Sequence, residues 1–273
     1  MYESYWHLNG KPFENGADDR FYFPSESHQG ALLKLRYAVE NFRGGALLTG
    51  VAGLGKTLLA EMLSRALDDS FGPFAHAVFP QMSTGELLHY LADELAGPSE
   101  SATAQNVPVS VRRIERFLQK NAEAGRHAVL AVDEAHLIDD NEAFEAIRLL
   151  LNFAPGGRPA MTLLLIGQTS ILPVLKRMPQ LDERLAVKCL LRTFTEQETA
   201  DYVNHRLEVA GSTRPIFEPD ALRVLHELTH GVARQINRLC DLALLIGFAE
   251  ERETLSAANL ESVSRELVEV VPE

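Results

Sequence analysis

The sequence feature that most restricts the fold is the glycine-rich stretch GVAGLGKT at residues 50–57. It matches the pattern G-x-x-x-x-G-K-[ST] and lies between a short apolar segment, 46–49, and a segment with helical spacing, 58–67. In such a loop the glycines let backbone N–H groups turn toward a phosphate, and the following helix directs its positive N-terminal end there. The pattern therefore predicts a strand, a phosphate-binding loop and a helix in succession.

Two side chains at the end of this loop have the chemistry that a nucleotide site needs. Lys56 can place a compact positive charge on the β- and γ-phosphates, and the hydroxyl of Thr57 can ligate Mg²⁺. We therefore predict binding of a nucleotide with Mg²⁺, and no residue pattern indicates a preference for ATP over GTP. The expected nucleotide contacts are Gly50, Ala52, Gly53, Leu54, Gly55, Lys56, Thr57 and Leu58.

A second motif is the pair of acids at the end of the apolar run 127–132. A buried parallel strand would deliver Asp133 and Glu134 to the carboxyl edge of the sheet, where ligands of open α/β folds bind. This resembles a Walker B pattern, in which Asp133 holds Mg²⁺ through water and Glu134 orients or deprotonates the attacking water. Taken alone, the pair is also compatible with a solvated loop start. The residues Asp133-Glu-Ala-His136 also spell the box of a helicase superfamily. Those motors need two tandem sheet domains, and one sheet followed only by helices cannot supply the second, so a helicase is set aside.

The rest of the chain alternates short apolar runs with helical patterns up to about residue 190, and then reads as helical throughout. Uninterrupted apolar strands favour a parallel sheet that is covered on both faces. We predict an α/β P-loop fold with a five-stranded parallel sheet, followed by a small all-helical domain. The expected division is an irregular aromatic arm at 1–24, the α/β domain at 25–189 and a helical lid at 190–273. Expected strands are 46–49, 75–79, 127–132, 162–166 and 187–191.

The composition restricts the kinds of partner that we expect this chain to bind. The chain has 273 residues, of which 46% are hydrophobic, and a net charge of −12, which disfavours a protein that simply coats a polyanion. A local basic patch remains open, because Arg112, Arg113 and Arg116 share one predicted helix. The two cysteines support neither a disulfide scaffold nor a zinc site. The N-terminal residues do not resemble a signal peptide and no apolar run is long enough for a membrane segment, so we expect a cytoplasmic protein.

With these motifs in place, the chain is identified as resembling an AAA+ ATPase, and in particular the cytoplasmic ATPase domain of the general-secretion ExeA/GspA family. The resemblance covers nearly the whole chain. It rests on the two nucleotide motifs and on the stretches Tyr5-Trp-His-Leu8, Pro12-Phe13, 27–35, 146–150, 165–168, His205-Arg-Leu207 and 231–241.

The resemblance implies roles that spacing alone does not. Gln168 falls at the sensor-1 position, which contacts the γ-phosphate and the lytic water, although a polar residue that caps a turn there is the alternative. Arg184 matches the place of an arginine finger that reaches the nucleotide of a neighbouring subunit, with Arg177 and Lys176 as rivals. Its alternative is a surface arginine paired with Asp182 or Glu183.

Arg234 corresponds to sensor 2, which would tie the lid to the γ-phosphate, and an ion pair within the acidic lid is the alternative. Pro12-Phe13 and the aromatic residues 21–23 would form part of the adenine wall by the same analogy, or simply pack in a core. The family's envelope members continue into a membrane helix, so the chain reads either as a cytoplasmic piece or as a soluble relative.

The resemblance implies a catalyst that hydrolyses ATP and assembles as a homo-oligomer. The first hypothesis is a machine that assembles or remodels a protein partner, such as a secretion or pilus apparatus. The second is a DNA-binding transposition regulator that resembles the TnsC/TniB and MuB group. A third is a nucleotide switch with negligible turnover.

Overall fold

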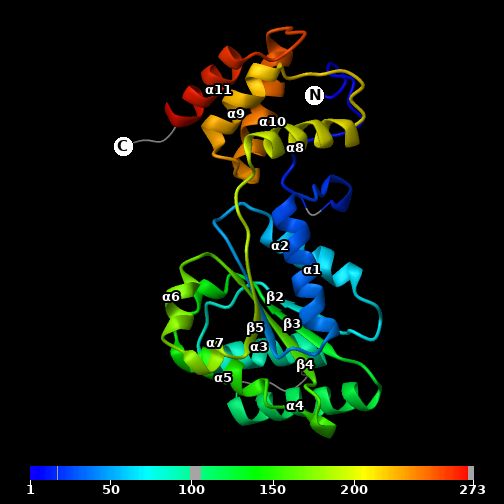
Figure 1. The fold of residues 1–273 in the computed structure, drawn as a ribbon, viewed down its shortest axis with the longest axis vertical. Helices are drawn as coiled ribbons and strands as arrows, with labels where there is room; N and C mark the ends of the chain where they lie inside the picture. The colour runs from blue at the N-terminus through cyan, green and yellow to red at the C-terminus, as the bar shows by residue number, and fades with distance from the viewer. Residues whose placement is uncertain (17, 99–105, 270–273) are drawn as a thin grey trace. The chain divides into compact units, whose positions relative to one another are not determined.

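The computed structural model describes residues 1–16, 18–98 and 106–269. Its five strands form one parallel sheet in the order β2-β3-β4-β1-β5, as the sequence predicted (Figure 1). All five run in the same direction, so their carboxyl ends share one edge. The strands are β1 (Gly45–Thr49), β2 (Phe74–Ala77), β3 (Ala128–Val132), β4 (Met161–Gly167) and β5 (Leu185–Leu190).

Helices cover both faces of this sheet, and the remaining helices follow it in the sequence (Figure 1). In order they are α1 (Glu26–Glu40), α2 (Lys56–Ala66), α3 (Thr84–Ala96), α4 (Val107–Glu123), α5 (Asn141–Leu150), α6 (Ile171–Lys176), α7 (Pro179–Asp182), α8 (Glu196–Val209), α9 (Pro219–Thr229), α10 (Ala233–Ala249) and α11 (Ala257–Glu269). Three single-turn 3₁₀ segments lie at Asp19–Phe21, Ala135–Leu137 and Pro155–Gly157.

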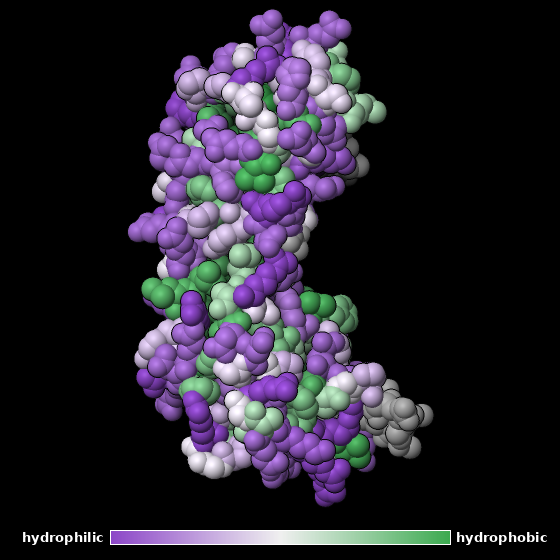
Figure 2. Space-filling view, turned by 90° about the vertical axis from the view of Figure 1, so that its right-hand side faces the viewer, coloured by the Kyte–Doolittle hydropathy of each residue, from purple (hydrophilic) through white to green (hydrophobic). Residues whose placement is uncertain are grey.

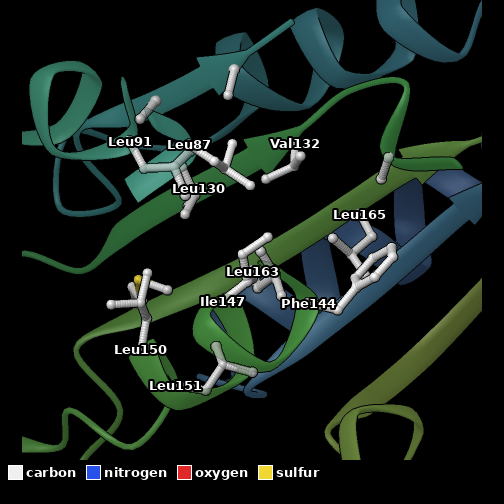
Figure 3. Packing of buried hydrophobic residues seen from close by; sticks show 14 of the residues in the cluster. Leu87, Leu91, Leu130, Val132, Phe144, Ile147, Leu150, Leu151, Leu163 and Leu165 are labelled. Atoms are coloured by element: carbon white, nitrogen blue, oxygen red, sulfur yellow. The ribbon is translucent and has the colours of Figure 1, made fainter. Parts of the chain in front are cut away.

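The central strands are buried on both faces because every side chain in them is apolar or small. In β3, Leu130 and Val132 join the core under α3 to α7, while Val129 and Ala131 alternate to the opposite face and are equally buried. Figure 3 shows Leu130 and Val132 packed with side chains of α3, α5 and β4. This two-sided burial explains why the strand sequences are continuous apolar runs.

The chain divides into two compact units. The first comprises Met1–Glu26, Gly53–Gly55 and Arg192–Glu273, and the second comprises Ser27–Ala52 and Lys56–Leu191. The sheet, α1 from Ser27 onward and helices α2 to α7 lie in the second unit. The N-terminal segment and helices α8 to α11 lie in the first, with their own core.

The N-terminal aromatic residues belong to the core of the first unit. Trp6 is fully buried and donates a hydrogen bond from Nε1 to the carbonyl oxygen of Leu244, 2.9 Å away. Phe13 is 2% exposed and packs edge-to-face on Phe217. Of the two roles considered from the sequence, Phe13 therefore has that of packing in the core of this unit.

A buried arginine attaches the N-terminal segment to the helices of the first unit. Arg206 on α8 is 6% exposed, and its guanidinium donates to the carbonyl oxygens of Pro12 and Glu14 at 2.5 and 2.9 Å. The same group donates to the hydroxyl of Tyr202 at 2.7 Å, and that hydroxyl donates to Asn237. The stretches that contain Arg206 and Asn237 were among those that carried the family resemblance, and in this unit they hold the N-terminal segment in place.

Some element boundaries differ from the sequence expectation. β2 ends at Ala77 rather than at residue 79, and Val78 and Phe79 are exposed after it. β5 begins two residues earlier than expected, at Leu185, and as an edge strand it buries Leu185 and Cys189 while Lys188 is exposed. The single-turn helix α7 had no sequence signal. Helix α4 begins at Val107.

A buried histidine makes the stability of the second unit depend on pH. His127 is 4% exposed, and its ring nitrogens lie 3.2 Å from the carbonyl oxygen of Pro159 and 2.8 Å from the hydroxyl oxygen of Thr162. Burial disfavours the charged ring and lowers the pKa of His127 to about 4. The unfolded chain, with a pKa near 6.5, therefore binds more protons between about pH 6.5 and 4.

We expect this histidine's contribution to the free energy of unfolding to be complete above about pH 6.5. It should be lost progressively as the pH falls toward 4, by up to about 3 kcal/mol. Urea unfolding of the wild type and of His127→Gln at pH 7 and at pH 4.5 measures this directly. The wild type should lose more stability than the variant over that interval. An equal loss in both would show that folding does not lower the pKa of His127.

Hydrophilic side chains dominate the face drawn in Figure 2, on which the apolar side chains form small separate groups. Within the described ranges, no helix combines the length and the apolar character needed to cross a bilayer. On α4, Arg112 and Arg116 are exposed, whereas Arg113 donates to Asp93 at 2.8 Å and to the carbonyl oxygen of Gly97. One member of the expected basic trio is therefore engaged within its own unit.

Candidate nucleotide site

The glycine-rich loop joins β1 to α2, as its sequence indicated. Gly53 and Gly55 have φ values of +83° and +81°, which L-residues with a side chain rarely adopt. Lys56 opens α2, is 6% exposed, and donates from Nζ to the carbonyl oxygens of Gly50 and Val51 at 3.1 and 2.9 Å. The lysine thus points back toward the first residues of the loop.

Within the first unit, the tip of the loop contacts the start of α10. The backbone N–H of Arg234 donates to the carbonyl oxygen of Gly53 at 3.1 Å. A Cβ atom added to Gly53 would lie 2.8 Å from Cβ of Arg234 and 3.2 Å from a methyl carbon of Val232. Glycine is therefore required at residue 53 both for its backbone conformation and for this close approach. The side chain of Arg234 is exposed.

The two expected magnesium ligands meet at the carboxyl edge of the sheet. Thr57 and Asp133 are 76 residues apart in the sequence, yet the Thr57 hydroxyl donates to Oδ2 of Asp133 at 2.6 Å. Asp133 directly follows β3 and is 3% exposed. Hydroxyl and carboxylate oxygens are the donor atoms that Mg²⁺ prefers, so these residues fit that ion.

Asp133 is held by more than one donor. Its Oδ1 accepts the backbone N–H of Glu134 at 2.8 Å, and Nε2 of His76 lies 3.4 Å from its Oδ2. Burial alone would raise the pKa of Asp133, but the contacts with His76, Thr57 and the Glu134 backbone outweigh it and lower that pKa below its usual value. The carboxylate is therefore charged at neutral pH, as a metal ligand must be.

Glu134 and Gln168 lie around a second histidine. Glu134 has a left-handed backbone with φ of 50°, and its Oε2 is 3.3 Å from Nδ1 of His136. The same Nδ1 accepts the backbone N–H of Gln168, which follows β4 directly, at 3.3 Å. The candidate water-orienting acid and the candidate sensor residue are thus brought to the same edge as Asp133.

Arg184 lies at the opposite edge of the sheet. It immediately precedes β5, and Leu185 pairs with Gly45 at the beginning of β1. Because the strands are parallel, the whole length of β1, roughly 16 Å to the glycine-rich loop, separates Arg184 from its own loop. Its guanidinium donates to Oδ1 of Asn152 at 3.0 Å, and not to either of the acids considered from the sequence. Asp182, one of those acids, pairs with Lys188 at 2.6 Å.

The structure of the second unit therefore brings Lys56, Thr57, Asp133, Glu134 and Gln168 to one edge and leaves Arg184 at the other. Sequence reasoning assigned no role at this site to His76 or His136. Each had a weak signal: His76 is a polar residue inside an apolar strand, and His136 follows the acidic pair by two residues. Neither signal tells which carboxylate the histidine contacts.

The structure has an AAA-type P-loop fold, and residues 41–175 match the family model described as "AAA domain". The chain resembles General secretion pathway protein A of Aeromonas hydrophila, with 33% identity over 252 residues. That alignment covers 91% of this chain but 45% of the relative, so the chain spans less than half of the length of that protein. The resemblance seen in the sequence is confirmed.

Solved structures support the same fold at lower identity. The ORC2 protein of Aeropyrum pernix, solved as ADPNP and ADP complexes, has 14% identity and a TM-score of 0.72, covering 97% of this chain and 73% of its own. The ORC1 protein of the same organism, solved with DNA, has 16% identity and a TM-score of 0.70, with coverage of 92% and 68%. The RuvB branch migration motor of Thermotoga maritima has 17% identity and a TM-score of 0.61, with coverage of 89% and 69%.

Proposed function

We propose that this protein binds and hydrolyses ATP with Mg²⁺, as an ExeA/GspA-type AAA+ ATPase. The observation that carries the proposal is the 2.6 Å contact between Thr57 and Asp133 beside the buried Lys56. A hydroxyl at the start of a helix, a charged carboxylate at a strand end and a lysine that faces the same loop are the parts that phosphoryl transfer requires.

Each residue has a separate task in this proposal. The N–H groups of the glycine-rich loop and the ammonium of Lys56 bind the phosphates. These donors and this positive charge stabilise the negative charge of the phosphate oxygens. A magnesium ion held by Thr57, and by Asp133 through water, would neutralise charge on the phosphate oxygens. Glu134 orients the attacking water and accepts its proton, and Gln168 positions the same water. Ala52, Leu54 and Leu58 would make the remaining contacts with the nucleotide.

We propose further that the active form is a homo-oligomer. Arg184 lies too far from its own loop, so it could act on phosphates only in a neighbouring copy, where its guanidinium would stabilise charge in the transition state. Residues 25–189 would form the ATPase domain and 190–273 the lid. Arg234 would make lid position sensitive to the γ-phosphate, and the Gly53 contact of its backbone supports that link.

The process that ATP hydrolysis would drive is proposed from the similarity to a relative, because the site itself does not indicate it. The similarity to General secretion pathway protein A favours a protein partner of the cell envelope secretion machinery. A role on DNA, as in a transposition regulator, has less support, because the chain is strongly acidic and Arg113 on α4 is already paired.

Binding of mant-ATP and steady-state release of phosphate from purified protein test the proposal, with Lys56→Ala as the variant. We expect the wild type to bind ATP, and to hydrolyse it only when Mg²⁺ is present. We expect Lys56→Ala to weaken binding at least about 10-fold, because one charged contact with the phosphates is lost. Arg65→Ala, which removes a cation from the far end of α2, is the matched control and should bind like the wild type.

The outcome that overturns the proposal is wild-type protein that takes up no nucleotide with Mg²⁺, or a Lys56→Ala variant that binds as tightly as the wild type. Repeating the assay over a range of protein concentrations tests assembly, since the specific rate should rise with concentration. Adding duplex DNA at low salt tests the alternative, because a salt-dependent stimulation would favour the DNA-directed function.

A further inference from the structure

The candidate magnesium ligand Asp133 contacts a histidine that the proposed mechanism does not use. His76 is on the edge strand β2, where it pairs in register with Ala131 of β3. Asp133 is two residues beyond Ala131, and side chains two apart along a strand point to the same face. The backbone N–H of Asp133 also donates to the carbonyl oxygen of Ala77 at 2.8 Å, which extends the pairing to the end of β3.

The side chains of His76 and Asp133 meet on this face. Nε2 of His76 lies 3.4 Å from Oδ2 of Asp133, and the two side chains are 21% and 4% exposed. The Nε2 atom itself is buried and makes no well-aligned hydrogen bond with any described residue. A buried N–H without a full hydrogen bond costs free energy, and a small shift toward Oδ2 would recover it.

A count of the acceptor positions on Asp133 shows what this contact can do. An ionised carboxylate has about four lone-pair positions, two on each oxygen. Thr57 and His76 approach Oδ2, and the backbone N–H of Glu134 occupies one position on Oδ1. One position on Oδ1 is left for a water molecule of a bound magnesium ion. Without the histidine, only Thr57 and the backbone N–H of Glu134 would hold the carboxylate, and a position on Oδ2 would be open as well.

We propose that His76 is a positioning residue of the magnesium site. In the tautomer that carries hydrogen on Nε2, it donates to Oδ2 of Asp133 and fixes the carboxylate with Oδ1 toward the metal-bound water. This inference rests on the proposed function, because it assumes that Thr57 and Asp133 hold a divalent ion with a nucleotide. Partners of metal ligands commonly change metal affinity by 10- to 100-fold when they are removed.

The test measures the divalent ion directly, in complexes that do not turn over. Free Mn²⁺ is followed by electron paramagnetic resonance while it is titrated into protein saturated with ADP. For His76→Ala we expect the dissociation constant for Mn²⁺ to rise about 10-fold, with metal-free ADP binding unchanged. His76→Gln places an amide N–H near the position of Nε2 and should restore the wild-type value to within about 3-fold.

The chain offers a matched control in His89, whose Nε2 lies 3.5 Å from Oδ2 of Asp93 on α3, away from the loop. His89→Ala removes a similar histidine–aspartate contact and should leave Mn²⁺ binding unchanged. A thermal melt of each variant checks that the fold is kept. If His76→Ala fails to fold, the His76→Gln variant and a His76→Asn variant, whose shorter amide cannot reach Oδ2, give the same comparison.

The outcomes separate this inference from the proposed function. Wild-type Mn²⁺ affinity in His76→Ala, or an equal loss in His89→Ala, overturns the role of His76 even if the wild type hydrolyses ATP. Weakened Mn²⁺ binding in His76→Ala that His76→Gln restores supports it, even if the wild type turns out not to hydrolyse ATP. An ADP complex of the wild type that binds no Mn²⁺ overturns both.

Discussion

Replacing Arg184 by alanine is expected to lower the ATPase rate about 10³-fold or more while the dissociation constant for ATP changes little. The reason is the position of Arg184 at the amino edge of the sheet, opposite the glycine-rich loop of its own chain. An arginine in that place cannot contribute to nucleotide binding in its own subunit. In the proposed homo-oligomer, its loss should affect only the transition state in a neighbouring subunit. Steady-state phosphate release and mant-ATP binding measure the two quantities separately.

A mixing experiment makes the prediction for Arg184 specific to action between subunits. Arg184→Ala keeps an intact loop and lacks the guanidinium, whereas Lys56→Ala keeps the guanidinium and lacks a working loop. Mixed in equal amounts, the two inactive variants should recover a measurable part of the wild-type rate.

Two further variants are controls for this experiment. Arg177→Ala tests a rival cation, and Asn152→Ala removes the hydrogen-bond partner of Arg184 within the chain. Asn152→Ala must not lower the ATPase rate as much as Arg184→Ala does, and the mixture of Arg184→Ala with Lys56→Ala must recover ATPase activity. Failure of either test would show that Arg184 has a structural role instead.

Glu134→Gln is expected to lower the ATPase rate by about 10² to 10⁴-fold and to preserve nucleotide binding. The amide has nearly the same shape as the carboxylate, and it still allows the 2.8 Å hydrogen bond between the residue 134 backbone and Asp133. It cannot accept a proton from the attacking water, so the variant should stay in an ATP-bound form. Single-turnover hydrolysis followed by separation of ATP and ADP provides the measurement.

The control for the Glu134 prediction is Glu142→Gln, an exposed acid at the start of α5. It should hydrolyse ATP at the wild-type rate. A wild type that turns over no faster than Glu134→Gln would identify the protein as a nucleotide switch rather than an ATPase. A Glu134→Gln variant that no longer binds nucleotide would instead show that this carboxylate is needed for the structure of the site.

Much of the second unit could be predicted because its signals are local. Apolar runs between glycines and helical patterns indicated each strand within about two residues, and the parallel arrangement followed from their continuous hydrophobicity. The meeting of Thr57 with Asp133 could also be predicted, since the carboxyl ends of parallel strands share one edge. The pattern of residues 50–57 then indicated a phosphate as the ligand.

Contacts that depend on register and side-chain reach could not be predicted. His76 approaches Asp133 only because β2 and β3 are paired with residue 76 opposite residue 131, and no sequence pattern states that register. In the same way, Arg184 contacts Asn152, 32 residues earlier in the chain, rather than the acids beside it, and no sequence pattern indicates that pair.

The amino-acid sequence by itself determined the order of the elements, the glycine-rich loop and the acids at the end of a strand. These follow from residue type and spacing, which act over a few neighbouring residues. Only the tertiary structure decided which donors surround Asp133 and that Phe13 is buried in the core of the first unit. It also decided that Arg206 joins Pro12 to α8. Such contacts connect residues far apart in the chain, so they exist only once packing has set the position of each backbone segment.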